Sequence, residues 1–373
     1  MIRNVCSFIN AGLKKINLNR IKYIAAALFL FSVYLVNKSA TSLSYDEMMV
    51  KLNSIKFTVN DEPPAKLEKT PNLLDNEPTS TQSIFFLSTN DVSNGIELLP
   101  RQACAVESAA VINPNRQVYM LITEEVDYKK FPLNNVTTAL LTYPNIHLMY
   151  FNPYEMVKGS VLESWLNTSS LLTSGHRKIH FSDILRLMML RKYGGVYMDS
   201  DMIALQDFDT IPENFACLVV HNPRNDLHVG NAFLGFNGEL GNKILDIYLK
   251  EIREHYNPNG STDNGPPMLT SLLNRFCNET DIDLMTVEAC QGFKIFPKTK
   301  CFDFSYWEWH DLFDVKKTNQ SIERLKKNDA IVTHYFTTIS KNHKFPSKEV
   351  NAFTTLAKKL CPRVMNNVGE FIQ

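Results

Sequence analysis

The stretch Phe181-Ser-Asp-Ile-Leu-Arg-Leu-Met-Met-Leu-Arg-Lys-Tyr-Gly-Gly-Val-Tyr-Met-Asp-Ser-Asp201 says most about the fold of this chain. Its pattern predicts an amphipathic helix, a turn at two adjacent glycines, and a short strand that ends in two carboxylates. Because strand residues i and i+2 point the same way, we expect Asp199 and Asp201 to aim at one site. Two neighbouring carboxylates repel each other and are costly to desolvate unless a positive charge lies beside them. A divalent cation that itself carries a diphosphate meets that need.

The predicted helix also contains two charged residues among apolar ones. Asp183 and Arg186 are three residues apart and therefore share one face of the helix. Charged residues in such an apolar stretch are expected to be paired or functional. We therefore take Asp183, Arg186, Asp199 and Asp201 as the candidate catalytic residues.

Short apolar runs alternate with helical segments from residue 84 onward. Residues 84–87, 117–122 and 146–150 predict buried strands, and residues 103–112 predict a helix between the first two. This alternation is typical of a largely parallel sheet that is covered on both faces. Ligands of open α/β sheets lie beyond the carboxyl ends of the strands. Residues 88–89 and 199–201 are both expected at such ends.

The 181–201 stretch resembles the nucleotide-sugar signature of DXD glycosyltransferases with the GT-A fold. Residues 183–201 fit the string D-x-x-R-x-x-x-L-x-x-x-G-G-x-Y-x-D-x-D. Residues 104–110, 231–236 and 265–270 and the late His334 follow the order and approximate spacing of one branch. That branch is the lactosylceramide 4-alpha-galactosyltransferase and alpha-1,4-N-acetylglucosaminyltransferase family, and the resemblance covers roughly residues 83–363.

The resemblance implies a GT-A-like α/β fold with a mainly parallel central sheet, a UDP-sugar donor and a divalent cation, with Mn²⁺ as the expected metal. Asp199 and Asp201 are the implied metal residues. Asp201 is expected to bind the ion directly. Asp199 is expected to contact the ribose, the donor sugar or a metal-bound water. Arg186 is expected to reach the diphosphate, and Asp183 the hydroxyl groups of the donor sugar.

Four further residues are candidates for substrate binding. Asn231 begins the segment that lies by the donor sugar in similar enzymes. Gly195 is expected to let the backbone approach the donor, whereas Gly194 is explained by the end of a helix alone. Gly265 fits either a loop over the acceptor side or a plain turn. His334 follows an apolar strand and is either near the metal and diphosphate or a hydrogen-bonded histidine at a strand end.

The chain departs from the family pattern at points that bear on the substrate. The family tends to read H-x-W-N-x-x-S where this chain has His334-Tyr-Phe-Thr-Thr-Ile-Ser340, and Ser88 stands where an acid is expected. The segment Trp307-Glu-Trp309, near Phe304 and Tyr306, is either an acceptor-stacking wall or ordinary packing.

The N-terminal part predicts a membrane anchor. Residues 23–36 are an unbroken apolar or weakly polar run, and five basic residues and no acid precede it. By the positive-inside rule this end stays in the cytosol. We predict a cytosolic tail at 1–22, a transmembrane signal-anchor at 23–40, a stem at 41–82 and a single glycosyltransferase catalytic domain at 83–373. A signal peptide cleaved near Ser42 is the alternative.

Charge and cysteine content agree with a secretory protein that does not bind nucleic acid. Lys and Arg number 39, as do Asp and Glu, so the chain has no overall charge that would attract nucleic acid. Six cysteines follow the predicted anchor: Cys104, Cys217, Cys277, Cys290, Cys301 and Cys361. Disulfides are favoured over buried thiols in an oxidising lumen, but the sequence does not resolve their pairing.

The resemblance leads to a functional prediction. We expect a retaining alpha-1,4-glycosyltransferase of the Golgi membrane, single-pass type II with a lumenal catalytic domain, that transfers galactose or N-acetylgalactosamine from a UDP-sugar to the terminal sugar of a glycosphingolipid. A homo-oligomer in the Golgi is compatible with this. The alternatives are a UDP-N-acetylglucosamine-dependent glycoprotein glycosyltransferase and a catalytically silent, membrane-tethered lectin or scaffold. Double displacement and front-face attack both stay open.

Overall fold

The structure is a computed structural model that describes residues 68–220 and 226–373. No helix within these ranges is long and apolar enough to cross a membrane. The predicted tail (1–22), the predicted anchor (23–40) and the first part of the predicted stem lie outside the described residues. The last part of the stem is packed: Leu73 is fully buried, and the Thr70 N–H donates to the carbonyl of Val126. The packed region therefore starts before residue 83, because Leu73 is an apolar anchor within a proline-containing, polar segment.

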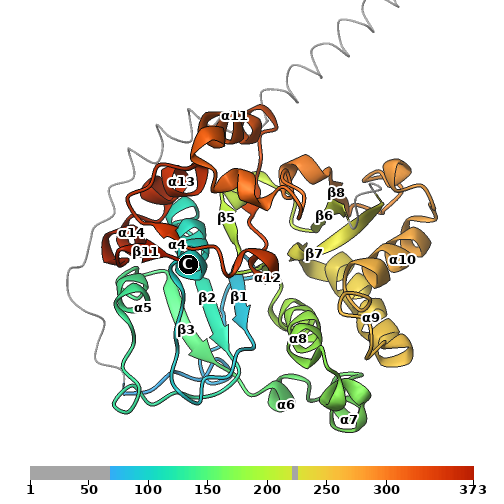
Figure 1. Cartoon of the computed structure of the whole chain (residues 1–373). Helices are drawn as coiled ribbons and strands as arrows, with labels where there is room; N and C mark the ends of the chain where they lie inside the picture. Colours follow the sequence, from blue (N-terminus) through green and yellow to red (C-terminus); the bar gives the residue numbers. More distant parts are fainter. Residues whose placement is uncertain (1–67, 221–225) are drawn as a thin grey trace, which may run out of the picture. The chain divides into compact units, whose positions relative to one another are not determined.

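A seven-stranded sheet with the order β3-β2-β1-β4-β7-β6-β8 forms the centre of the fold (Figure 1). Strands β1 (Ile84–Ser88), β2 (Val118–Ile122), β3 (Ile146–Tyr150) and β4 (Gly195–Met198) are parallel to their neighbours in this set. Strand β7 (Leu227–Phe236) runs antiparallel to β4 and to β6 (Phe215–Val220), and β8 (Lys294–Phe296) is parallel to β6. The predictions of an α/β fold and a mainly parallel sheet are thus confirmed.

Alternate residues of β1 show that both faces of the sheet are covered. Ile84 and Phe86 join a core that includes residues of helix α4 (Pro100–Ile112). Phe85 and Leu87 join the other core, which includes residues of α8 (Arg177–Tyr193), α9 (Gly238–His255) and α10 (Pro266–Cys277). The two cores follow from the period-two alternation of side chains along a strand.

The remaining elements are short. Strand β5 (Met202–Ala204) pairs antiparallel with β9 (Val332–His334), and β10 (Phe345–Pro346) pairs with β11 (Phe371–Ile372). The other α-helices among the described residues are α5 (Asn135–Leu140), α6 (Pro153–Met156), α7 (Glu163–Thr168), α11 (Thr318–Lys327), α12 (Thr337–Ser340), α13 (Ala352–Leu360) and α14 (Pro362–Asn367).

The helix of the 181–201 stretch differs from the expected amphipathic pattern. Every residue from Asp183 to Leu190 in α8 is buried. The helix packs against β1, β4 and β7 and also against α9, so that its whole circumference is covered over these two turns. Asp183 and Arg186 therefore lie inside the protein rather than at the edge of an exposed face.

Two glycines connect α8 to β4 with positive φ angles, 68° at Gly194 and 101° at Gly195. An added Cβ at Gly195 would lie 2.4 Å from the carbonyl oxygen of Ser83, the residue before β1. Glycine is therefore required here for the close pairing of β4 with β1 as well as for its backbone conformation.

Three disulfides join the six cysteines that follow residue 100. They are Cys104–Cys361, Cys217–Cys301 and Cys277–Cys290. The prediction of disulfides is confirmed. The first bridge links residues 257 positions apart and ties α4 to the end of α13. The second attaches β6 to the segment that begins at Cys301, which is important for the site.

Candidate active site

Two acids and a histidine come together just beyond the carboxyl end of β4. One ligand atom from each of Asp199, Asp201 and His334 lies within 4.8 Å of the others. The reason differs from the one expected from strand alternation, because β4 ends at Met198 and residues 200–201 form a turn before β5. The turn, and not an extended strand, brings the two carboxylates to one side.

The pairing of β5 with β9 delivers His334 to this turn. Met202 is opposite His334 in the antiparallel pair, so the histidine ring reaches the residue before Met202. Its Nε2 lies 3.0 Å from Oδ1 of Asp201, and the Thr337 N–H donates to the other carboxylate oxygen at 2.8 Å. Burial would raise the pKa of Asp201, but His334 and the Thr337 N–H outweigh it and lower the pKa. Asp201 is held as a carboxylate.

Arg186 links Asp199 of the turn region to Asp183 of the same helix. Its Nη1 lies 3.1 Å from Oδ1 of Asp199, and its Nη2 lies 3.4 Å from Oδ1 of Asp183. The guanidinium also donates to the backbone carbonyl of Asn231 at 2.7 Å and packs 4.5 Å above the ring of Tyr197. Burial would lower the pKa of Arg186, but Asp199, Tyr197 and Asp183 raise it overall, so this cation stays charged.

Internal partners occupy this guanidinium, and only 6% of the Arg186 side chain is exposed. This geometry favours a role in orienting Asp183 and Asp199. The expected direct contact of Arg186 with a diphosphate stays a prediction. Burial raises the pKa of Asp199, and Asp201 adds to this rise while Arg186 opposes it. The Tyr197 hydroxyl donates to Oδ1 of Asp199 at 2.6 Å, which leaves Oδ2 for a ligand.

Asn231 joins a third acid to the group. Its Nδ2 donates to Oδ1 of Asp183 at 2.8 Å, and both side chains are buried. Burial raises the pKa of Asp183, whereas Arg186 and the Asn231 amide lower it. Gly265 comes before α10 and lies close to the Asn231 side chain, because an added Cβ would lie 2.7 Å from the Asn231 Nδ2.

The structure thus brings seven of the eight predicted residues close together. They are Asp183, Arg186, Asp199, Asp201, Asn231, Gly265 and His334. Gly195 is separate, since it starts β4 whereas Asp199 follows the other end of that strand. Its close neighbour is the Ser83 backbone.

A pocket of about 380 Å³ lies along the same edge of the sheet. It is lined by the residues that follow β1, β2 and β3, among them Thr89, Thr123 and Asn152, and by the start of α8. The charged residues in its wall are Arg177 and Lys178 on the basic side and Asp91 and Glu124 on the acidic side. The expectation that residues 88–89 lie at a ligand-binding edge agrees with this position.

Sequence reasoning missed several residues that hold the site together. Tyr197 donates through its hydroxyl to Asp199. Thr337 acts through its backbone N–H, which no residue type reveals. Ser182 accepts from Arg186 through its hydroxyl at 2.9 Å, and its place one residue before Asp183 was the signal available.

Two family models match the chain. The one described as "Glycosyltransferase sugar-binding region containing DXD motif" matches residues 100–216, and "Alpha 1,4-glycosyltransferase conserved region" matches residues 238–368. The chain is 27% identical to the lactosylceramide 4-alpha-galactosyltransferase of Rattus norvegicus over 62% of this chain and 61% of the relative. It is 26% identical to the alpha-1,4-N-acetylglucosaminyltransferase of Homo sapiens over 77% of this chain and 81% of the relative.

Solved structures resemble the fold at a lower level. The apo form of the glycosyltransferase GlyE of Streptococcus pneumoniae is 13% identical, with a TM-score of 0.40, over 77% of this chain and 63% of that one. A likeness of this size carries no argument about the site.

The DXD region, the alpha-1,4 region and the assembled carboxylates point the same way: the chain carries the two conserved regions of DXD-motif alpha-1,4-glycosyltransferases. Within that class it is similar to the lactosylceramide 4-alpha-galactosyltransferase and alpha-1,4-N-acetylglucosaminyltransferase family. The predictions of the family and of an enzyme are confirmed. The alignment with the rat relative spans less than two thirds of that relative's length.

Proposed function

We propose that this protein is a retaining alpha-1,4-glycosyltransferase that moves galactose or N-acetylgalactosamine from a UDP-sugar to the terminal sugar of a glycosphingolipid. The observation that carries the proposal is the meeting of Asp199, Asp201 and His334 within 4.8 Å of one another, at the sheet edge that also has the pocket. The names of the relatives support an alpha-1,4 linkage and a glycolipid acceptor. Retention of configuration rests on the resemblance alone.

The residues of the cluster fit a hard divalent cation. Carboxylate oxygens suit Mn²⁺ or Mg²⁺, and an imidazole nitrogen in the set favours a transition metal over Mg²⁺ or Ca²⁺. We therefore propose Mn²⁺, held by Asp199, Asp201 and His334. When bound, the ion would supply positive charge against the diphosphate that leaves the sugar.

The pocket is the proposed place of the nucleotide. It lies beyond the carboxyl ends of three parallel strands, where ligands of α/β sheets bind. Arg177 and Lys178 in its wall can pair with phosphate oxygens, a role for which basic side chains are suited. This leaves Arg186 to orient Asp199 from inside the protein.

The Asp183–Asn231 pair is the proposed place of the donor sugar. A carboxylate fixed by an arginine and an amide can accept hydrogen bonds from sugar hydroxyls in a definite direction. Gly265 leaves room for the Asn231 amide, and any residue with a Cβ at this position would displace it.

Membrane attachment and location belong to the same proposal. A single-pass anchor at residues 23–40 and a stem would place the catalytic domain in the Golgi lumen as a type II protein, either alone or as a homo-oligomer. The basic residues before the apolar run support this orientation. The three disulfides support an oxidising compartment.

A second candidate donor, UDP-N-acetylglucosamine, is favoured by the human relative, whose alignment covers 77% of this chain. Release of free UDP distinguishes the candidates. The purified protein would be incubated with Mn²⁺, with UDP-galactose, UDP-N-acetylgalactosamine or UDP-N-acetylglucosamine, and with lactosylceramide or a glycoprotein acceptor. Metal-dependent UDP release with one sugar and a glycolipid supports the proposal. No turnover with any combination would favour the silent lectin or scaffold.

A further inference from the structure

We propose that Tyr306 and Trp307 form the platform on which the acceptor sugar stacks. Arg324 is the residue that positions this platform. This inference rests on the proposed function and adds a specificity-determining surface to the same site. It assigns different roles to Trp307 and Trp309, because the two side chains have different environments.

The segment starts beside the metal cluster. Cys301 is bonded to Cys217 of β6, and the next residue, Phe302, is buried with its ring 5.4 Å from that of His334. The Cε2 atom of Phe302 is also only 3.1 Å from where a Cβ of Gly230 in β7 would lie. The segment that contains Tyr306 and Trp307 therefore begins between the cluster and strands β7 and β6.

This side is opposite to the proposed nucleotide pocket. In the sheet order β3-β2-β1-β4-β7-β6-β8, the pocket follows the first three strands and the carboxylates follow β4. A nucleotide that lies over β1 to β3 directs its diphosphate to the cluster after β4. The transferred sugar and then the acceptor must lie further on, over β7 and β6. Phe302 lies at that position, and Tyr306 and Trp307 follow it within five residues.

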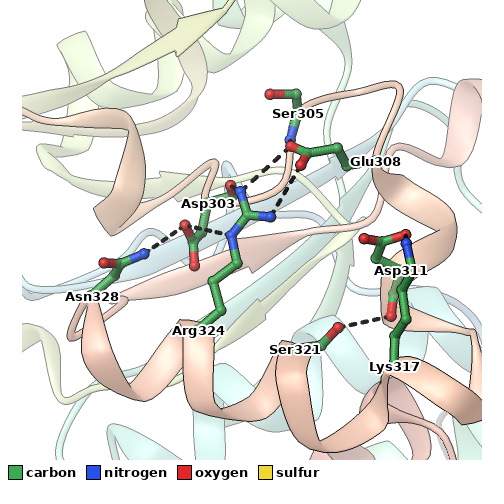
Figure 2. Close-up of polar contacts among 8 residues, drawn as sticks. All are labelled: Asp303, Ser305, Glu308, Asp311, Lys317, Ser321, Arg324 and Asn328. Atoms are coloured by element: carbon green, nitrogen blue, oxygen red, sulfur yellow. Dashed lines mark hydrogen bonds and ion pairs between the residues drawn. The ribbon is translucent and has the colours of Figure 1, made fainter.

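An ion-pair network holds the segment rigid (Figure 2). The Arg324 Nε donates to Oδ1 of Asp303 at 3.2 Å, and its Nη1 donates to Oε1 of Glu308 at 3.1 Å. Glu308 in turn accepts from the Ser305 N–H at 2.9 Å, and Asn328 donates to Asp303 at 2.8 Å. Arg324 thus grips the segment both before and after the aromatic pair.

The ion-pair network and the aromatic pair differ in how deeply their side chains are buried. Asp303 is only 1% exposed and its Oδ1 accepts from both Arg324 and Asn328, so its role is to hold the segment. Tyr306 and Trp307 lie between its clamped ends, are only half-buried, and meet edge to face at 4.9 Å. Half-exposed rings on a rigid backbone lose little entropy on binding, and they offer apolar faces beside polar tips to a sugar ring.

Trp309 provides the contrast. Its ring contacts Phe313 at 5.8 Å and His343 at 5.4 Å, and it packs against the hydrophobic core of that face of the sheet. The segment was expected to form either an acceptor-stacking wall or ordinary packing. We therefore assign acceptor stacking to Trp307 and ordinary packing to Trp309.

The test uses the full chain with Mn²⁺ and UDP-galactose, and p-nitrophenyl β-galactoside as a soluble acceptor. Three quantities are measured: transfer kinetics, acceptor-independent hydrolysis of the UDP-sugar, and acceptor binding in the presence of UDP and Mn²⁺. We expect Trp307→Ala to raise the acceptor KM about 10-fold or more, the scale of one lost stacking contact. The hydrolysis rate and the donor KM should stay within about two-fold of the wild type.

Arg324→Lys keeps the charge but loses the two-pronged grip, so it should raise the acceptor KM without changing hydrolysis. Trp309→Ala is the packing control, and it should lower the melting temperature while changing the acceptor KM little in the protein that remains folded. A folded Trp307→Ala or Arg324→Lys variant with an unchanged acceptor KM overturns the inference. Wild-type protein that binds the galactoside through Trp307 but transfers nothing would refute the proposed function and leave the platform standing.

Discussion

Gly265→Ala is a small change whose effect can be followed through two contacts. The new Cβ would lie 2.7 Å from Nδ2 of Asn231, closer than real Cβ atoms approach other atoms, and 3.2 Å from its Cγ. The Asn231 amide is buried and donates to Asp183 at 2.8 Å, so it cannot move away without stretching that bond. The substitution therefore acts on Asp183 from a residue that does not touch it.

A hydrogen bond to a charged group contributes about 1.5–3 kcal/mol. If Asp183 orients the donor sugar, its loss in the transition state lowers kcat/KM by roughly 10- to 150-fold. The assay is acceptor-independent hydrolysis of the UDP-sugar, with the melting temperature as a check on folding. Gly175→Ala is a matched control, because an added Cβ there meets nothing within 4 Å.

A double-variant cycle tests whether Gly265→Ala acts on hydrolysis through Asn231. In an Asn231→Ala background the clash at Gly265 is removed, so Gly265→Ala should have little further effect on hydrolysis. Additive losses in the double variant, or a Gly265→Ala protein within two-fold of the wild type, would refute the reasoning that Asn231 fixes Asp183 for the donor.

Three further predictions concern charge and stability. Arg186→Lys should lower transfer by 10-fold or more at an unchanged acceptor KM, because a lysine cannot reach Asp199 and its other partners at once; initial rates check this. Burial raises the pKa of Glu107 to about 7 in the folded protein, so the unfolded chain loses this proton at a lower pH. The free energy of unfolding should therefore fall by about 3 kcal/mol as the pH rises from about 4.5 to 7. Urea titrations should show that slope reduced in Glu107→Gln. Replacing both Cys104 and Cys361 by serine should lower the free energy of unfolding by roughly 2–5 kcal/mol, measured in the same titrations.

The fold was predictable from the sequence wherever the local pattern of residues is enough to determine a helix or strand. Residues 84–87, 117–122 and 146–150 are apolar runs between turns, and all three form parallel strands close to the expected bounds. The antiparallel strand β7 was not predicted, because its ten residues include glycines whose fit depends on neighbours. Gly235, for example, lies against the ring of Phe215 in β6.

The site was predictable in its residues but less so in its geometry. Asp199 and Asp201 were expected together on a strand, yet they meet at a turn whose form depends on β5 pairing with a segment more than 100 residues later. The same pairing places His334 beside Asp201, a contact that no local pattern encodes. The internal role of Arg186 was equally hidden, since helix periodicity does not show that α8 is covered on every side.

The central claim is that Asp199, Asp201 and His334 hold a divalent cation that carries the nucleotide. It is tested most directly by calorimetric titration of UDP into the protein with Mn²⁺ and with EDTA, for the wild type and for Asp201→Asn. This substitution preserves size and removes the charge that faces His334. We expect the wild type to bind UDP only when Mn²⁺ is present, and a folded Asp201→Asn protein to bind it at least 100-fold more weakly, roughly the loss of one metal ligand. Equal UDP affinity in EDTA, or in Asp201→Asn, would contradict it.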